Sequence, residues 1–276
     1  MKNKKENNKD WIDKFYEKYF DETTSEEELK KCFQFKNQQI PNSLYQFTKS
    51  KHVEDLLVND LMYLRTFDQL NDPFDGHFLG ENKVMTKTSV EELQNEIQIK
   101  VEKHRIEVDM DYKKYYKVAC FTQDNDDTVM WGVYGDNQKG ICIEYDFHKD
   151  PVFEFFCMPV NYVEQPNHDR IINKTIDKEH YSNRSADEVF LKKTDNWSHE
   201  KEWRIVVNTI TPYKHYEFEG DYKYLKFMKP ESVYLGIKMV DKEKDRIIEM
   251  CKTRNIKVYE MKQDNEKVKL VSDKII

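Results

Sequence analysis

The stretch WSHEKEWRIVV, residues 197–207, places two glutamates one residue apart in front of an apolar run that is typical of a buried strand. If this segment is extended, residues at i and i+2 point to the same side, so Glu200 and Glu202 would share one face. Two carboxylates this close cost stability unless a cation or hydroxyl pairs with them. The pair therefore indicates either an ion-pair cluster with Lys201, Arg204 or another basic residue, or a carboxylate that orients a ligand or acts in catalysis.

The sequence on either side of this stretch alternates between helical and strand periodicity. Apolar spacing predicts helices within residues 9–37, 53–57, 90–101, 126–134, 184–194 and 241–254. Runs rich in β-branched and aromatic residues predict strands at 43–48, 61–66, 116–122, 140–145, 153–156, 160–163, 203–207, 224–227, 232–236 and 256–260. No linker rich in Pro, Gly or Ser separates them. We therefore expect a helical N-terminal extension, residues 1–40, and a single α+β domain, residues 41–276.

The composition narrows the class of protein. The 276 residues carry a formal net charge of −7, which argues against a broad surface for nucleic acid or another polyanion. Five scattered cysteines without a Cys-x-x-Cys spacing are typical of a reducing compartment. The basic N-terminus is followed by no apolar signal segment, and no apolar run approaches the ~18 residues of a membrane span. We expect a cytoplasmic protein that does not enter the membrane.

Several common catalytic motifs are missing from the sequence. The seven glycines form neither G-x-G-x-x-G nor a P-loop, and there is no nucleophile elbow and no H-E-x-x-H motif. The eight histidines have no metal-ligand spacing, so we expect no metal. Cys120 lies in an apolar run, where a thiol is more often a packing group than a nucleophile.

Four segments, taken in order, resemble the prokaryotic family known as domain of unknown function 2971. The segments are LYQFT at 44–48, FDQLNDPF at 67–74, CFT at 120–122 with MWGVY at 130–134 and GICIE at 140–144, and WSHEKEWR at 197–204. Together they span roughly residues 43–240 of the chain. No established activity attaches to this family, but its pattern looks like a remote version of the ADP-ribosyltransferase fold. The resemblance implies an α+β domain with a split, mostly antiparallel central sheet flanked by helices.

The resemblance also implies a site and a co-substrate. Enzymes of the ADP-ribosyltransferase fold bind NAD with three separated elements around the split sheet, the third of which carries a glutamate, often in a Glu-x-Glu pair. By that resemblance Glu202 would be the catalytic carboxylate, and Glu200 its partner that orients the acceptor. The side chains expected to bind the nucleotide are Tyr45, Gln46, Thr48, Asn71, Phe74, Thr122, Trp131, Tyr134 and Arg204.

Some of these residues have a plain structural interpretation beside the functional one. Residues 71–74 are typical of a turn, and Trp131 and Tyr134 are as well suited to core packing. Gln46 departs from the pattern of the fold, which has a His or Arg at that place, so Arg65 or Arg204 would supply the missing positive charge.

Three functions remain open from the sequence. The leading hypothesis is transfer of ADP-ribose from NAD to an unidentified acceptor, with a role in bacterial phage defence or as a toxin expected by association with such enzymes. The alternative is a non-catalytic module on the same fold that senses a nucleotide or binds a protein. A hydrolytic effector would need a metal cluster that the sequence does not show.

Overall fold

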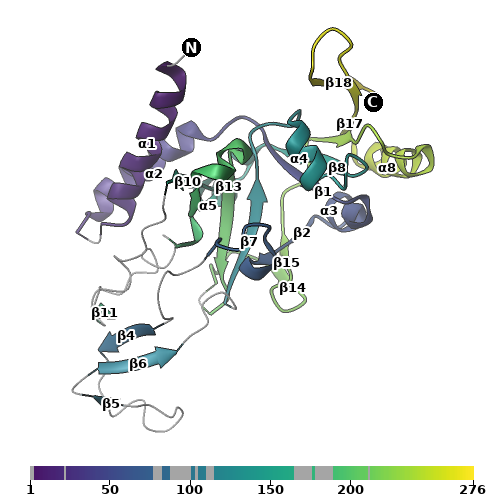
Figure 1. The fold of residues 1–276 in the computed structure, drawn as a ribbon. Coiled ribbons are helices and arrows are strands. Elements are labelled where there is room, and N and C mark those ends of the chain that lie inside the picture. Colours follow the sequence, from purple (N-terminus) through teal and green to yellow (C-terminus); the bar gives the residue numbers. More distant parts are fainter. Residues whose placement is uncertain are drawn as a thin grey trace.

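The structure, a computed structural model, describes residues 3–21, 23–76, 83–87, 101–102, 105–109, 115–164, 176–177, 189–210 and 212–276 (Figure 1). The fold is α+β with mostly antiparallel sheets, as predicted. One central sheet has the strand order β1 (Leu44–Thr48), β8 (Ile141–Tyr145), β16 (Ser232–Leu235), β17 (Lys257–Gln263) and β18 (Leu270–Lys274). The other has the order β3 (Arg65–Thr66), β7 (Tyr116–Phe121), β13 (Trp203–Asn208) and β9 (Met158–Pro159).

Among the described residues, a single pair joins these two sheets. Tyr45 and Thr122 form an isolated antiparallel bridge, in which each backbone N–H donates to the other residue's carbonyl at 2.8 Å. On its other side β1 pairs with β8, and β7 pairs with β13. The central sheet is therefore split between β1 and β7, which agrees with the split sheet expected from the sequence.

Smaller sheets and helices surround this centre. Three strands form the order β14 (Phe218–Glu219), β15 (Tyr224–Lys226) and β2 (Leu61–Tyr63), and β10 (Asn161–Val163) runs parallel to β12 (Lys192–Thr194). A further sheet has the order β11 (Ile176–Asp177), β4 (Lys83–Lys87), β6 (Arg105–Asp109) and β5 (Val101–Glu102). Among the described residues, the α-helices are α1 (Asn3–Tyr19), α2 (Glu26–Gln39), α3 (Val53–Leu57), α4 (Thr128–Val133), α5 (Pro151–Phe156) and α8 (Asp241–Arg254). Figure 1 shows α1 and α2 at one end and α3 and α8 at the other.

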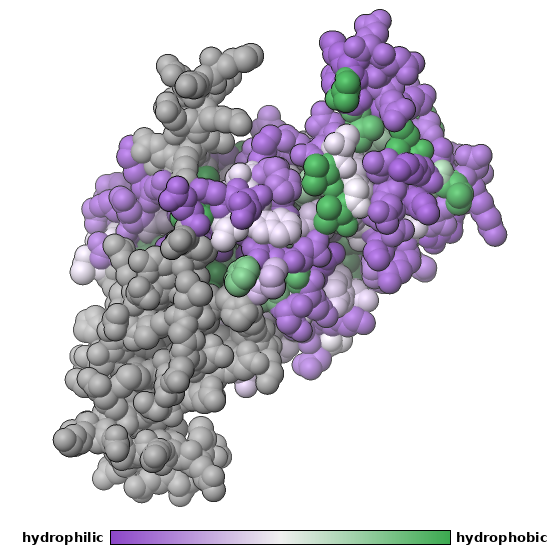
Figure 2. Space-filling model, viewed as in Figure 1, coloured by the Kyte–Doolittle hydropathy of each residue, from purple (hydrophilic) through white to green (hydrophobic). Residues whose placement is uncertain are grey.

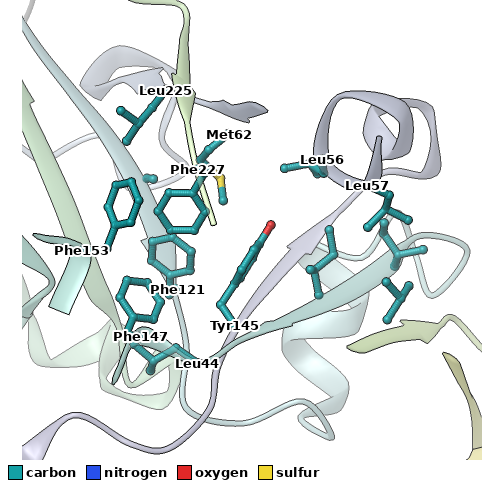
Figure 3. Packing of buried hydrophobic residues seen from close by; sticks show 14 of the residues in the cluster. Leu44, Leu56, Leu57, Met62, Phe121, Tyr145, Phe147, Phe153, Leu225 and Phe227 are labelled. Carbon is teal, nitrogen blue, oxygen red and sulfur yellow. The ribbon is translucent and has the colours of Figure 1, made fainter. Parts of the chain in front are cut away.

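The core beside the bridge is built largely from aromatic rings (Figure 3). Phe121 packs edge-on against Phe147 at a centroid distance of 5.0 Å, and Phe153 lies 4.4 Å from Phe227. Leu44 and Phe121, the chain neighbours of the two bridging residues, are both buried in this cluster. Burial of their side chains fixes where the two sheets meet, because displacement of either strand would expose apolar surface.

The N-terminal helices α1 and α2 pack against β9, β13 and α5. The Trp11 ring lies 6.2 Å from that of Trp203, and the Tyr16 hydroxyl donates to the Pro159 carbonyl. The Lys36 ammonium is buried and donates to three carbonyls that follow one another closely in the chain, at 2.7, 2.9 and 3.0 Å. Burial lowers the pKa of Lys36 to about 8. A buried ammonium that binds three carbonyls fastens α2 to α5.

We expect Lys36→Met to lower the free energy of unfolding by about 1–3 kcal/mol, since carbonyls of Glu154, Phe155 and Cys157 would lose their donor while an ammonium no longer has to be buried. For a chain of this length the melting temperature should fall by about 3–8 °C. Lys31→Met is the matched control, because Lys31 on the same helix makes only an exposed pair with Glu27. Equal melting temperatures for both variants would show that Lys36 does not fasten the helices.

The structure corrects two predictions of local structure and contradicts the C-terminal ends of two predicted helices. Residues 153–156 belong to α5 rather than to a strand, because Asp150 accepts from the N–H groups of Val152 and Phe153 and Pro151 occupies the first turn. In the predicted helix 184–194, residues 184–188 lie outside the described residues and 192–194 form β12. In the predicted helix 90–101, residues 90–100 also lie outside them, and Val101 is in a strand. The stretch before β13 is a 3-10 helix, residues 195–200, and is not extended.

Candidate functional site

A pocket of about 530 Å³ opens where β1 and β7 diverge from the Tyr45–Thr122 bridge. Its walls include residues 45–48 of β1 with Lys49 after them, and residues 118–121 of β7 with Thr122 after them. Among the described residues the bridge between the strands is isolated, so the backbone edges of Gln46–Thr48 and Ala119–Phe121 face the pocket. The volume lies in the range of small-molecule sites, and unpaired strand edges offer donors and acceptors to a ligand.

Most side chains that the sequence singled out meet at this pocket. Those on its wall are Tyr45, Gln46, Thr48, Asn71, Thr122, Tyr134, Glu200, Glu202 and Arg204. Two others lie elsewhere. Phe74 is 65% exposed and is not part of the wall, whereas Trp131 is buried, packs against Phe47 and donates from its indole to the Asn125 carbonyl at 2.7 Å. Trp131 therefore has the packing role that was one of its two interpretations.

Glu200 and Glu202 lie on the same side of the chain, as expected, but the backbone between them is not extended. Glu200 ends the 3-10 helix, Lys201 adopts a left-handed conformation with φ 45° and ψ 49°, and Glu202 precedes β13. The Thr122 hydroxyl donates to the Glu200 carbonyl at 2.6 Å, and the Val160 N–H donates to the Glu202 carbonyl at 2.9 Å. The turn at Lys201 sends its own side chain outward to Asp124 and both carboxylates inward.

Arg204 lies at the centre of the buried charges. Its side chain is fully buried and donates to both carboxylate oxygens of Glu202 at 2.8 and 2.9 Å. It donates likewise to both oxygens of Asp75 at 2.7 and 2.5 Å, and to the Phe190 carbonyl at 2.8 Å. These contacts use all five N–H groups of a guanidinium. Arg204 thus holds Glu202 and Asp75 and has no donor left for a ligand phosphate.

Glu200 has a different set of partners. The Lys193 ammonium lies 2.5 Å from Glu200 Oε2, 3.2 Å from Glu202 Oε2 and 3.6 Å from Asp75 Oδ2. The Tyr134 hydroxyl, from the end of α4, donates to Glu200 Oε1 at 2.5 Å. Among the described residues the cluster therefore contains three carboxylates and two cations, and these carry one excess negative charge when all are ionised.

The surroundings shift the pKa values of Glu200 and Glu202 in opposite directions. Burial and the neighbouring Glu202 raise the pKa of Glu200, and Lys193 and Tyr134 offset this only in part. Burial also acts to raise the pKa of Glu202, but Arg204 and Lys193 outweigh it and lower that pKa to about 2. Titratable neighbours with opposite shifts are typical of functional sites. The excess charge of the cluster falls on Glu200, which also faces the Tyr134 hydroxyl.

Cationic side chains line another part of the wall. Arg65 from β3 is half-buried there, and among the described residues no carboxylate lies within ion-pair distance of it. Lys49 follows β1 and reaches Asp136 only at 4.0 Å. At roughly 3.3 Å per residue, Lys49 lies about 13 Å beyond Tyr45 along the chain. Arg65 and Arg204 were the two candidates for the positive charge that Gln46 lacks. Of these, Arg65 is the one available to a ligand. Gln46 itself donates to the Met62 sulfur at 3.0 Å.

Asp75 and Lys193 were not found from the sequence. Asp75 lies in the turn-rich loop that was noticed, where Asp72 accepts from the Phe74 N–H at 2.9 Å and Gly76 follows with φ +65°. The sequence did contain one signal for Asp75, an acidic residue between a turn that contains a proline and a glycine. Lys193 lay in a predicted helix, and nothing in the local pattern marks it for burial.

Further properties bear on what the site can hold. Within the described residues, no group of three or more His, Cys, Asp or Glu side chains is arranged to bind a metal ion. No helix among those residues has the length and apolarity needed to cross a membrane.

Comparison with known proteins gives one match. No curated protein and no solved structure matches the chain. The family described as "Protein of unknown function (DUF2971)" matches residues 130–205. This range contains Tyr134, Lys193, Glu200, Glu202 and Arg204, whereas Tyr45, Arg65 and Asp75 lie before it. The resemblance to domain of unknown function 2971 is thus confirmed over residues 130–205, the segment that supplies Glu200 and Glu202.

Proposed function

We propose that the pocket binds NAD and that the chain transfers ADP-ribose from it to an acceptor, with the Glu200 carboxylate beside the reacting ribose. One observation carries this proposal. The Glu200–Tyr134 pair and the guanidinium of Arg65, which has no ion-pair partner among the described residues, line the same pocket at a split between two sheets.

The charges of the pocket complement those of NAD. The nicotinamide ring carries a positive charge, and the pyrophosphate carries two negative charges. The buried cluster around Glu200 has an excess negative charge, and Arg65 and Lys49 provide cations farther along the wall. A planar guanidinium is well suited to bind phosphate oxygens in pairs. Nicotinamide near Glu200 and pyrophosphate near Arg65 is the orientation that this distribution favours.

The chemistry needs a carboxylate where positive charge develops. When the bond between nicotinamide and ribose breaks, its electron pair leaves with nicotinamide, and the ribose carbon becomes cationic. An acceptor atom then bonds to that carbon and releases its proton. A fixed carboxylate stabilises this cation, and it can also accept a hydrogen bond from a ribose hydroxyl. Glu200 meets both needs, with Tyr134 and Lys193 holding its two oxygens in place.

The hydrogen bonds favour a division of roles opposite to that expected from the sequence. Both oxygens of Glu202 are bound by Arg204, and Lys193 is also close to one of them. Glu202 is thus the residue that orders the cluster, and we assign the position beside the ribose to Glu200. The position of Gln46, whose amide donates to Met62, favours a second candidate, a module that binds the nucleotide without turning it over.

Binding of NAD to the purified protein tests both candidates. We expect NAD at about 100 times its dissociation constant to stabilise the protein by roughly 2.7 kcal/mol and to raise the melting temperature by several degrees. Arg65→Met should remove most of this shift, because the pyrophosphate would lose its guanidinium. Release of nicotinamide from bound NAD separates the enzyme from the binding module. No shift for the wild type at millimolar NAD would contradict both.

A further inference from the structure

A second set of rings lines the wall of the same pocket, and we call this part of the wall the His52–Tyr63 end. The His52 and Tyr63 rings are nearly parallel, at 17°, with centroids 6.4 Å apart. Beside them on the wall are Leu56 and Leu61, only 5% and 8% exposed, and the half-buried Asp55. This end thus combines flat rings, an apolar floor and one carboxylate.

The Tyr63 ring is held in place before any ligand binds. Tyr224 packs edge-on against it at 5.8 Å and 70°, and the Tyr63 hydroxyl donates to Gln69 Oε1 at 3.3 Å. Burial and the neighbouring Lys51 lower the pKa of His52, which favours the neutral form of its ring. A neutral imidazole and a fixed phenol ring lose little conformational freedom when a planar group stacks on them.

We infer that this end of the pocket is a subsite for adenine, with His52 and Tyr63 providing the stacking surface and Asp55 accepting from the exocyclic amine. Bases stack on aromatic side chains, and the apolar floor favours a purine over a smaller pyrimidine because more surface is buried. The polar edge of adenine would meet Asp55, and the phosphate that follows the adenosine would meet Lys49 and Arg65.

The inference deepens the proposed function, on which its orientation of NAD rests. Glu200 would face the nicotinamide ribose, and the His52–Tyr63 rings would hold the other nucleoside. The adenine subsite itself does not require any transfer chemistry. It can therefore be tested with a ligand that lacks nicotinamide.

Calorimetric titration of the full chain with AMP, uridine monophosphate, nicotinamide mononucleotide and NAD tests the subsite. We expect wild type to bind AMP more tightly than uridine monophosphate. Tyr63→Ala should weaken binding of AMP and of NAD about tenfold or more, since stacking on one ring is lost, and should leave nicotinamide mononucleotide unchanged within twofold. Tyr63→Phe keeps the ring and should keep AMP affinity. His52→Ala is a second variant in case Tyr63→Ala fails to fold.

Each outcome separates the subsite from the proposed function. AMP affinity unchanged in Tyr63→Ala and in His52→Ala, or no AMP binding to wild type at millimolar concentration, overturns the subsite even if NAD is turned over. AMP binding that depends on Tyr63, in a protein that releases no nicotinamide, supports the subsite and rejects the transferase. Equal affinities for AMP and uridine monophosphate would contradict recognition of a purine.

Discussion

Glu200→Gln should reduce nicotinamide release from NAD by about 100- to 10,000-fold, because the amide cannot stabilise the developing cation. The variant should fold, and near pH 7 it should be at least as stable as wild type. The raised pKa of Glu200 means that the fold favours its neutral form; the stability gained from protonation is present below about pH 4.5 and is lost as the pH rises through the raised value. Gln is a permanent mimic of the neutral form, and it leaves two carboxylates opposite two cations.

Glu202→Gln is the matched control for this variant, and the pKa shift of Glu202 affects stability in the opposite direction. The pKa of Glu202 is lowered from 4.5 to about 2, so its ionised form contributes stability above pH 4.5 that is lost as the pH falls toward 2. That shift corresponds to roughly 3 kcal/mol of unfolding free energy at neutral pH. We expect urea denaturation to show a loss of this order for Glu202→Gln and none for Glu200→Gln.

The pH profile of the wild type gives a further check on the same assignment. Nicotinamide release should decline on the acid side as Glu200 is protonated, with a midpoint above 4.5. If Glu200→Gln retained full turnover and Glu202→Gln, assayed while folded, lost it, the catalytic role would return to Glu202. An acid limb below pH 4 would also contradict the role of Glu200.

Arg204→Met should be the most destabilising single substitution that we predict. It leaves Asp75 and Glu202 buried without the guanidinium that binds four of their oxygens. Removal of one partner from a buried ion pair costs about 3–5 kcal/mol, and here two carboxylates lose the same partner. Because domains are stable by only about 5–15 kcal/mol, we expect a largely unfolded protein at 37 °C. Circular dichroism and urea denaturation measure this directly.

Arg65→Met is the control for loss of a guanidinium from the same pocket. Among the described residues Arg65 has no ion-pair partner, so its removal should change the unfolding free energy by about 0.5 kcal/mol or less. Arg204→Lys should not restore stability, since one ammonium cannot bind two carboxylates in the bidentate manner of a guanidinium. If Arg204→Met unfolded with the same midpoint as Arg65→Met, the buried cluster would not support the fold.

Local patterns in the sequence were sufficient for the strands and helices whose apolar periodicity is unbroken. The strand, helix and strand of β16, α8 and β17 were predicted from the chain alone, and β16 and β17 do pair in parallel. A capping box of Ser25 and Glu28 starts α2 within the region predicted to be helical. The incorrect predictions lie where apolar runs are short. Residues 153–156 were predicted to form a strand, but the cap at Asp150 and the proline after it start a helix.

The sequence by itself determined that two adjacent carboxylates would need a cation, and Arg204 two residues farther on was visible as one. Only the tertiary structure decided which glutamate that arginine binds, because Asp75 comes from 129 residues away and completes the guanidinium's set of partners. The left-handed turn at Lys201 then brings Glu200 to Lys193 and Tyr134. Electrostatic energies depend on distance and burial rather than on separation along the chain, so the unequal acidities of Glu200 and Glu202 exist only once the sheets have met.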